Sequence, residues 1–309
     1  MRMAIIDMGT NTFNLLIVET TEDKNYKIIF KGKEGVKLGK GGINNSIITP
    51  EAFNRGVNAI ENHIINIKRL NVDRIIATAT SGIRSTDNGE EFVKTIENKF
   101  GLKIKIVSGD EEADLIYRGV KQAIKLNNEN TLILDIGGGS NEFIIANGEG
   151  LLWKYSFNLG IARLLDMFKP SDPISPKEIE TVEEYIDSEL SVLYDAIKIY
   201  HPKNLIGCSG TFNTIRSIII AKNNCIPKEI KNKASYPISL EEYAILHKEL
   251  LDSTLEERNN MKGLEPVRVE MIVLASIFVN FIINKLKINS LTQSAFAIKE
   301  GLVNKILNS

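Results

Sequence analysis

Two segments of the chain repeat one another, and this internal repeat limits the fold more than any other feature of the sequence. Residues 5–12 (IIDMGTNT) align without a gap with residues 133–140 (ILDIGGGS), and a second apolar stretch follows each of them. An apolar strand, an Asp-x-Gly turn and a returning apolar strand predict a β-hairpin whose turn exposes backbone amides. We therefore expect each half of the chain to open with the same hairpin.

Beyond the hairpins, strand-like and helix-like stretches alternate, which favours an α/β fold with parallel strand pairing. We expect strands at 26–30, 36–38, 74–79, 103–107, 131–136, 142–147, 150–157, 204–208 and 290–294. We expect helices at 50–69, 90–100, 161–168, 176–200, 239–251, 265–286 and 298–308, and two more that begin near 110 and 211. Residues 222–238, which contain Pro227 and Pro237, predict a surface loop.

Length and composition are those of a globular protein with two domains that share a cleft. The chain has 309 residues, about twice the length of a typical domain. We expect domains at 1–122 and 123–309, with the helix at 298–309 able to pack back on the first domain. Apolar residues make up 43% and charged residues 25%, which excludes collagen-like, low-complexity and wholly disordered chains.

The charge balance excludes several classes of partner. With 38 basic and 39 acidic residues, the net charge of -1 creates no field that would attract nucleic acid or a membrane surface. The longest apolar stretch, 271–283, is shorter than the ~20 residues that a membrane span needs. Cys208 and Cys225 match no disulfide or metal-binding pattern, which favours a reducing, cytoplasmic location. Any polyanion must therefore be bound by a local site.

The two Asp-x-Gly turns have the composition of a site for metal and phosphate. Asp7 and Asp135 end their strands in turns that we expect to face solvent, where each could hold a hydrated Mg²⁺ against phosphate. Glycines let the backbone approach a ligand closely, so consecutive amides can bind phosphate oxygens. The phosphate-binding candidates are Gly9, Thr10, Asn11, Thr12, Gly137, Gly138, Gly139 and Ser140. One such turn is common in hairpins, but two in matched register favour a functional role.

Two adjacent glutamates follow the strand expected at 103–107. Ser108 and Glu111 have the spacing of a helix capping box, and this structural role accounts for Glu111. Adjacent helical positions point ~100° apart, so the capping box leaves Glu112 free. A carboxylate at this position could act as a general base that takes a proton from an attacking water.

Two further clusters follow expected strands, which is where α/β folds place their ligands. Arg84 could neutralise phosphate charge, or it could form a structural ion pair. The second cluster predicts either a nucleotide- or anion-binding turn at the start of a helix or a plain turn, and its candidates are Gly207, Ser209, Gly210 and Thr211.

In their order along the chain, these motifs resemble those of the exopolyphosphatase / guanosine pentaphosphate phosphohydrolase (Ppx/GppA) family. The resemblance continues through Arg163, Arg268 and residues 299–301, so it covers nearly the whole chain. It implies the fold of the actin/Hsp70/sugar-kinase superfamily, in which two ribonuclease-H-like domains close on phosphates across an interdomain cleft.

The same resemblance assigns roles to individual residues. It implies that Glu112 is the catalytic base and that Glu142 is a second catalytic carboxylate near the attacking water and the metal. It also implies that Asp7 and Asp135, with Glu142 as a further metal ligand, hold Mg²⁺ as the cofactor, and that the turns at 9–12 and 137–140 bind phosphate.

Several positions depart from the family pattern, and these departures leave the substrate more open than the chemistry. Asn14 stands where many relatives carry a basic residue, and Asp114 stands where arginine is common. Asn141 replaces the usual threonine, and Lys37 replaces a frequent arginine, which keeps the charge but loses the bidentate fork. The turn at 207–210 also differs from the usual glycine-rich turn.

The resemblance implies a Mg²⁺-dependent phosphohydrolase that releases the terminal phosphate of inorganic polyphosphate, of guanosine pentaphosphate or of both. The implied partners are inorganic polyphosphate or guanosine penta- or tetraphosphate. A phosphotransferase (kinase) on the same scaffold and a non-catalytic sensor of alarmone or polyphosphate are the alternatives. We expect Lys37, Lys40 and Arg84 to form a basic groove that captures the anion. The apolar helix expected at 265–286 would allow a homodimer.

Overall fold

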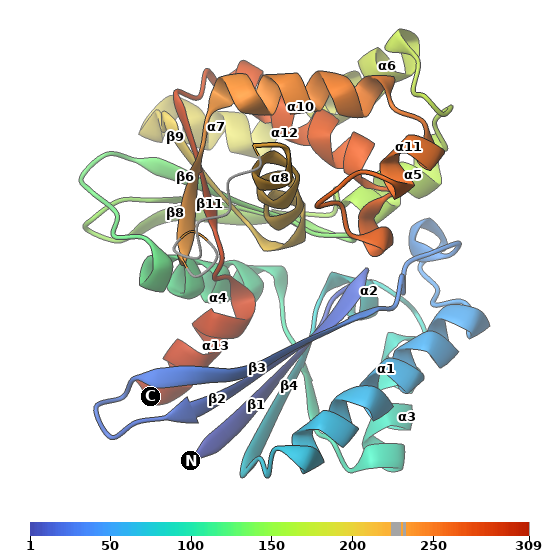
Figure 1. Cartoon of the computed structure of the whole chain (residues 1–309), viewed down its shortest axis with the longest axis vertical. Coiled ribbons are helices and arrows are strands. Elements are labelled where there is room, and N and C mark those ends of the chain that lie inside the picture. Colours follow the sequence, from blue (N-terminus) through green and yellow to red (C-terminus); the bar gives the residue numbers. More distant parts are fainter. Residues whose placement is uncertain (224–229, 231–232, 309) are drawn as a thin grey trace.

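The computed structural model describes residues 1–223, 230 and 233–308 and consists of two α/β halves, one above the other in Figure 1. Each half is built on a mixed β-sheet, with five strands in the first and six in the second. Cys225, Pro227 and much of the predicted loop at 222–238 lie outside the described residues.

The first sheet opens with an antiparallel meander. Its strands, in the spatial order β3-β2-β1-β4-β5, are β1 (Arg2–Met8), β2 (Thr12–Thr20), β3 (Tyr26–Gly35), β4 (Arg74–Ala79) and β5 (Ile104–Ile106). β1 pairs antiparallel with β2 and parallel with β4. β1 and most of β2 are buried on both faces, as their continuous apolar runs predict.

The second sheet repeats this order and adds one strand. Its strands, in the order β10-β11-β9-β6-β7-β8, are β6 (Thr131–Ile136), β7 (Asn141–Ala146), β8 (Leu151–Phe157), β9 (Asn204–Cys208), β10 (Ser235–Ile238) and β11 (Ser290–Ser294). β6 pairs antiparallel with β7 and parallel with β9, as β1 does with β2 and β4. The α/β fold with two ribonuclease-H-like domains, predicted from the repeat and the resemblance, is therefore confirmed.

Within the described part of the chain, helices pack against the faces of both sheets. They are α1 (Pro50–Arg69), α2 (Ser81–Arg84), α3 (Gly89–Phe100), α4 (Gly109–Ala123), α5 (Ile161–Phe168), α6 (Pro176–Glu189), α7 (Ser191–Tyr200), α8 (Ser209–Lys222), α10 (Leu240–Asp252), α11 (Leu255–Asn259), α12 (Ile272–Leu286) and α13 (Ile298–Leu307). α1 begins where the sequence predicts, because Thr49 caps its first turn and Pro50 occupies the first helical position.

Two helices lie between the halves and connect them. α4 contacts β7 and β8 of the second sheet, whereas α13, the last helix, contacts β1 of the first sheet. The two helices also pack on each other, and the side-chain amide of Gln122 donates to the carbonyl of Glu300 at 2.9 Å. Their position between the sheets is visible in Figure 1. The boundary at 122/123 stays a prediction.

Some expected elements differ from the structure. Residues 36–38 form no strand, because the amides of Val36 and Lys37 donate to the carbonyl of Asn11 and tie this segment to the first turn. The helix expected at 176–200 is broken at Leu190, which ends α6 and precedes α7.

Two further differences concern the last third of the chain. The expected loop at 222–238 contains strand β10 at its end. The helix expected at 265–286 begins only at Ile272, after a single 3₁₀ turn (η2) at Pro266–Arg268, and the short helix α11 was not expected. The apolar side chains of α12 are buried inside the second half, among them Ile272, Phe278 and Ile282. Among the described residues, no helix is long and apolar enough to span a membrane.

Candidate active site

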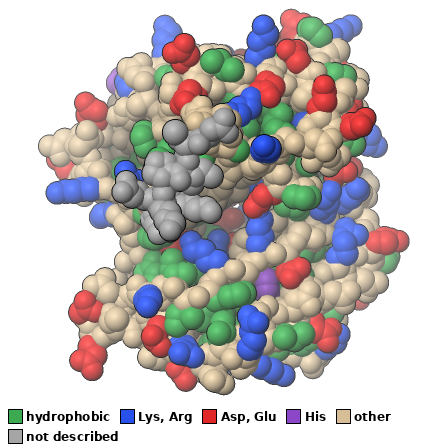
Figure 2. Space-filling model, in the orientation of Figure 1, with side chains coloured by type: hydrophobic (Ala, Val, Ile, Leu, Met, Phe, Trp, Pro, Cys, Tyr) green, Lys and Arg blue, Asp and Glu red, His purple; other side chains and the backbone are tan. Residues whose placement is uncertain are grey.

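The two hairpin turns meet at one cavity of about 270 Å³. Its lining includes most of the predicted site residues from both halves: Asp7, Gly9, Thr10, Asn11, Thr12, Glu112, Asp135, Gly137, Gly138, Gly139, Ser140, Glu142, Ser209, Gly210 and Thr211. Arg84 and Gly207 are not part of the lining. On the face shown in Figure 2, acidic and basic side chains are interspersed, so the cavity itself must supply any strong local charge.

The two turns have the same backbone geometry. The amide of Gly9 donates to the carbonyl of Thr12 at 3.1 Å, and the amide of Gly137 donates to the carbonyl of Ser140 at 3.0 Å. The matching sequences thus fold into matching turns, and each turn follows the strand that carries its aspartate.

The tips of the two turns pack against each other. A Cβ atom at Gly139 would lie 2.6 Å from the hydroxyls of Thr10 and Ser81, so glycine is required for this close approach. The side-chain amide of Asn11 and the hydroxyl of Ser81 are buried at the cavity and have no hydrogen-bond partner among the residues that the structure describes. Unpaired buried polar groups are costly. These atoms are therefore available to bind a polar ligand.

Asp7 and Asp135 are more buried than the sequence predicts, with exposed fractions of 7% and 6%. The side chain of Asn14 donates to Asp7 at 3.1 Å, and the hydroxyl of Ser209 donates to Asp135. Burial raises the pKa of Asp7. Burial, reinforced by the charge of Asp7, raises the pKa of Asp135 to about 6. The expectation that both lie in solvent-facing turns is wrong, because the two turns pack against each other and both aspartates lie in the cavity between the halves.

This donor set fits Mg²⁺. Within the described part of the chain, no three His, Cys, Asp or Glu side chains lie close enough to hold a metal ion by themselves. Mg²⁺ is usually bound by one or two carboxylates, with waters and substrate phosphates completing its shell. Asp7 and Asp135 offer two buried carboxylates, and a divalent cation bound between them would relieve their mutual repulsion. Direct metal binding by Glu142 stays a prediction.

The structure separates the two adjacent glutamates at the start of α4. The amide of Glu111 donates to the hydroxyl of Ser108 at 3.1 Å, which caps the helix. The reciprocal bond of a capping box is absent, because the carboxylate of Glu111 instead binds Lys105 and Lys305 at 2.6 and 2.9 Å. Glu111 thus points to the protein surface, and Glu112 lines the cavity.

Glu112 is buried, with 8% of its surface exposed, and is paired with Arg84. The guanidinium donates to Glu112 at 2.9 Å and to the carbonyl of Val107 at 2.8 Å, so Arg84 takes the ion-pair role. Burial and the charge of Glu142 raise the pKa of Glu112, and Arg84 opposes this shift. A raised pKa brings a carboxylate closer to neutral pH, where a general base works best.

The Arg84→Gln variant is expected to lose activity at neutral pH and to recover it at alkaline pH. The cation stabilises the ionised form of Glu112, so its removal raises the pKa of the carboxyl further. Because a base must be ionised, the acidic limb of the profile of kcat/KM against pH should move to higher pH. Arg84→Lys retains the charge and should move this limb less. Unchanged acidic limbs in both variants would contradict this role.

Glu142 lies on β7, directly opposite Asp135 on β6. Its carboxylate accepts hydrogen bonds from the hydroxyls of Ser140 and Ser156, both at 2.7 Å. Burial and the charge of Asp135 raise the pKa of Glu142 to about 7. Glu142 can therefore donate or accept a proton near neutral pH. Sequence reasoning missed Ser156, which lies on a different strand.

The predicted anion turn is divided between two roles. Ser209, Gly210 and Thr211 line the cavity where β9 ends and α8 begins. Ser209 has a left-handed backbone (φ 61°), a strained conformation that directs its hydroxyl to Asp135. Gly207 is a packing position, because a Cβ atom there would lie 2.1 Å from the ring of Phe212.

Arg268 is the most important cavity residue that motif reasoning left without a role. Its side chain is 13% exposed, and within the described part of the chain its Nε atom has no hydrogen-bond partner and lies 3.7 Å from a carboxylate oxygen of Glu265. A Cβ atom at Gly210 would lie 1.3 Å from its guanidinium, so the arginine lies directly on the anion turn. Lys33 and Lys299 also line the cavity. These cations are assembled only by the folded chain.

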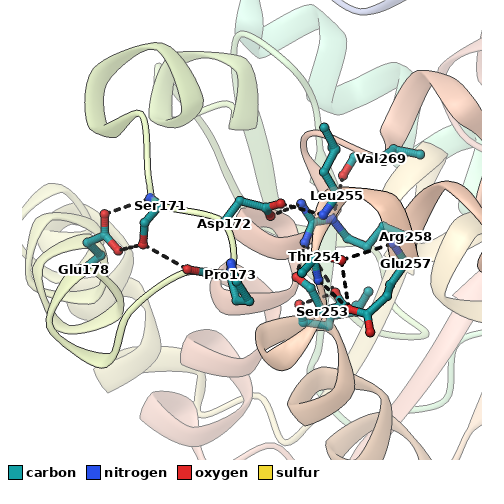
Figure 3. A network of polar contacts seen from close by, with 11 residues as sticks. Ser171, Asp172, Pro173, Glu178, Ser253, Thr254, Leu255, Glu257, Arg258 and Val269 are labelled. Atoms are coloured by element: carbon teal, nitrogen blue, oxygen red, sulfur yellow. Dashed lines mark hydrogen bonds and ion pairs between the residues drawn. The ribbon is translucent and has the colours of Figure 1, made fainter.

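A polar network fixes the segment that carries Arg268 (Figure 3). The buried guanidinium of Arg258 donates to the carbonyl of Val269, the residue after Arg268, at 3.1 Å. It also donates to the carbonyl of Ser253 and to Asp172, which lies in the loop between α5 and α6. This network joins three separate segments of the second half and anchors the turn next to Arg268.

The departures from the family pattern have structural explanations. Asn141 accepts a hydrogen bond from the amide of Gly137 at 3.1 Å and donates to the carbonyl of Leu159 at 2.7 Å, so it supports the second turn. Asp114 forms an ion pair with Lys154 at 2.6 Å and is not part of the cavity lining. Asn14 lies opposite Asp7 in register, as Glu142 lies opposite Asp135.

The chain is similar to known phosphatases over its whole length. A family model described as the Ppx/GppA phosphatase family matches residues 16–309. The crystal structure of an exopolyphosphatase from Cytophaga hutchinsonii is 36% identical, with a TM-score of 0.96 over 100% of this chain and 98% of that chain.

Two curated relatives are longer than this chain. A bifunctional 3-dehydroquinate synthase/phosphatase of Fusobacterium nucleatum is 30% identical over 301 residues, covering 91% of this chain and 43% of that protein. A guanosine-5'-triphosphate,3'-diphosphate pyrophosphatase of Pseudoalteromonas atlantica is 25% identical over 306 residues, covering 99% of this chain and 58% of that protein. The chain thus spans about half the length of these relatives.

Proposed function

The chain belongs to the Ppx/GppA phosphatase family, and on this premise we propose that it is a Mg²⁺-dependent phosphohydrolase that releases the terminal phosphate of inorganic polyphosphate or guanosine pentaphosphate. The main support for the proposal is the set of residues that line the cavity. Five buried carboxylates, an arginine whose side chain is 13% exposed and several polar atoms without a hydrogen-bond partner among the described residues converge there from both halves. Catalytic sites typically concentrate such perturbed groups in one cleft.

In the proposed reaction, water attacks the terminal phosphorus while the carboxylate of Glu112 takes a proton from that water. The bond between the terminal phosphorus and the bridging oxygen breaks. The two products are inorganic phosphate and the remaining chain, which is one phosphate shorter. Arg268 and the turn amides neutralise the negative charge on the phosphoryl oxygens. Asp7 and Asp135 would hold Mg²⁺, which supplies further charge neutralisation at the phosphates.

Glu142 has a supporting role in this proposal. Its pKa of about 7 allows it to exchange a proton with the water or with the product phosphate near neutral pH. The hydroxyls of Ser140 and Ser156 hold its carboxylate in place. The contact between the turns, through Thr10 and Gly139, brings phosphate donors from both halves to one substrate.

Phosphate release tests the proposal directly. Tripolyphosphate, long polyphosphate and guanosine pentaphosphate should be compared side by side, each with Mg²⁺ and with EDTA. We expect Mg²⁺-dependent release from at least one of them. Phosphate transfer to an added hydroxyl acceptor, without release to water, would identify a kinase. Tight binding with no turnover of any substrate would identify a sensor, and either result would overturn the hydrolase assignment.

A further inference from the structure

A set of ion pairs joins the two halves at the cavity and beside it, and we call it the mouth pairs. Lys33 on β3 forms an ion pair with Glu265. Lys37 and Lys40 both form ion pairs with Glu270, and the distance from Lys40 to Glu270 is 3.6 Å. Lys33 and Glu265 line the cavity and are partly exposed, with exposed fractions of 33% and 48%. The pair of Lys33 and Glu265 therefore lies where the cavity meets solvent, whereas the pairs of Glu270 lie outside the cavity lining.

Both sides of the mouth pairs are tied to the phosphate-binding groups. On the first half, the amide of Lys37 donates to the carbonyl of Asn11 at 2.9 Å, within the first turn. On the second half, Glu265 and Glu270 flank the 3₁₀ turn that carries Arg268. The two segments touch, because a Cβ atom at Gly35 would lie 3.0 Å from Val267. An anion that leaves the cavity along this side must pass the mouth pairs.

The size of the cavity makes this path important for a long substrate. A volume of about 270 Å³ lies just below the ~300–1,000 Å³ that is typical of small-molecule sites. The cavity suits a few phosphates at the end of a chain, whereas the remainder of a long polyphosphate must extend through the opening. Tripolyphosphate, by contrast, has little or no chain left outside.

The mouth pairs neutralise the lysines that such a chain would need. Sequence reasoning expects Lys37 and Lys40 to form a basic groove, but in the structure both are paired with Glu270. The hydrogen bond from Lys37 lowers the pKa of Glu270, so this carboxylate is ionised at neutral pH. Three lysines faced by two glutamates leave a single net positive charge along the opening.

We propose that Glu265 and Glu270 are specificity-determining residues that favour substrates with a short phosphate tail over long polyphosphate. The glutamates hold the mouth lysines in ion pairs and repel a chain that passes them. This inference rests on the proposed phosphohydrolase function, because it concerns the substrate of the same cavity.

The test is the double variant Glu265→Gln and Glu270→Gln, which keeps the shape of the mouth and frees three lysines. For each protein, kcat/KM should be measured with long polyphosphate and with tripolyphosphate at low and moderate ionic strength. We expect the ratio of long to short substrate to rise about tenfold or more at low salt, and to fall back as salt screens the lysines. The matched control, Glu241→Gln with Glu256→Gln, removes two exposed charges elsewhere and should leave the ratio unchanged.

The inference would be overturned if the double variant had an unchanged or lower ratio of kcat/KM for long polyphosphate to kcat/KM for tripolyphosphate. An equal loss of kcat/KM with both substrates is one such result. Calorimetric binding of both anions in EDTA provides a readout that needs no turnover. If no protein released phosphate, the proposed function would fail, and the ratio of the two binding constants would still decide whether Glu265 and Glu270 discriminate against the long anion.

Discussion

Replacing Glu112 with glutamine is expected to lower kcat by about 10²–10⁴-fold, the range typical of a lost general base. Glutamine keeps the size of the side chain and can still accept the hydrogen bond from Arg84, but it cannot take a proton. Binding should persist, and affinity should rise slightly, because repulsion between the carboxylate and the phosphates is removed. Phosphate release measures kcat, and calorimetry measures affinity.

The neighbouring glutamate supplies the matched control. Glu111→Gln removes the ion pairs with Lys105 and Lys305 on the surface, and such pairs contribute about 0–1 kcal/mol. Its kcat should stay within about twofold of the wild type. A dead Glu111→Gln enzyme beside an active Glu112→Gln enzyme would show that the base is assigned to the wrong residue. If both variants stayed active, Glu142 would become the next candidate base.

Asp135→Asn is expected to abolish most phosphate release and, at the same time, to stabilise the metal-free protein. The loss of activity, about 10²-fold or more, follows from removing a carboxylate that would hold the metal. The gain in stability follows from burial, because at neutral pH the folded protein must keep this carboxyl charged next to Asp7. The shift of the pKa from 3.8 to about 6 corresponds to roughly 3 kcal/mol.

Because the pKa of Asp135 is raised in the folded protein, the stability difference between Asp135→Asn and the wild type should depend on pH. Between pH 3.8 and about 6, the folded wild type binds a proton at Asp135 that the unfolded chain has already lost. This contribution to wild-type stability therefore falls as pH rises through that interval. Asparagine has no such proton, so the advantage of the variant should be small near pH 4 and fully developed above about pH 7. Denaturant unfolding in EDTA at several pH values measures this difference.

Asp252→Asn is the control for this experiment, because it removes one exposed carboxylate far along the chain from the turns. Its free energy of unfolding should change by less than about 0.5 kcal/mol at any pH. An Asp135→Asn protein that is less stable than the wild type at pH 7 in EDTA would show that the carboxylate is structural. Near-normal turnover at saturating Mg²⁺ would remove Asp135 from the metal site.

The duplicated architecture could be predicted from sequence, because local signals specify it. Hairpin turns, apolar runs and helix starts such as Thr49 with Pro50 depend on residues close together in sequence. They can therefore be predicted without knowing the fold. Expectations were wrong where a distant contact outweighed the local signal. Residues 36–38 are the example, since their amides bind the carbonyl of Asn11 instead of forming a strand.

The candidate site divides in the same way. Asp7, Asp135 and Glu112 could be found from sequence because each is part of a short motif, a turn or a helix start, that occupies a known place in the fold. The burial of the aspartates and the partner of Arg84 could not be found, since both depend on packing between elements that are far apart in sequence. Ser156 is part of no motif, and Arg268 was included in the family resemblance without a role, so the function of both is recognised only from their place at the cavity.

By itself, the sequence determined the two matched turns, their aspartates and Glu112 as the glutamate that does not cap the helix. These features are local, because they depend on residue spacing over short distances along the chain. Only the tertiary structure decided the electrostatics of the site. It brought Lys33 to Glu265, which is 232 positions away, and buried Asp7 beside Asp135. Charge interactions depend on distance and burial, and neither quantity can be read from the order of residues.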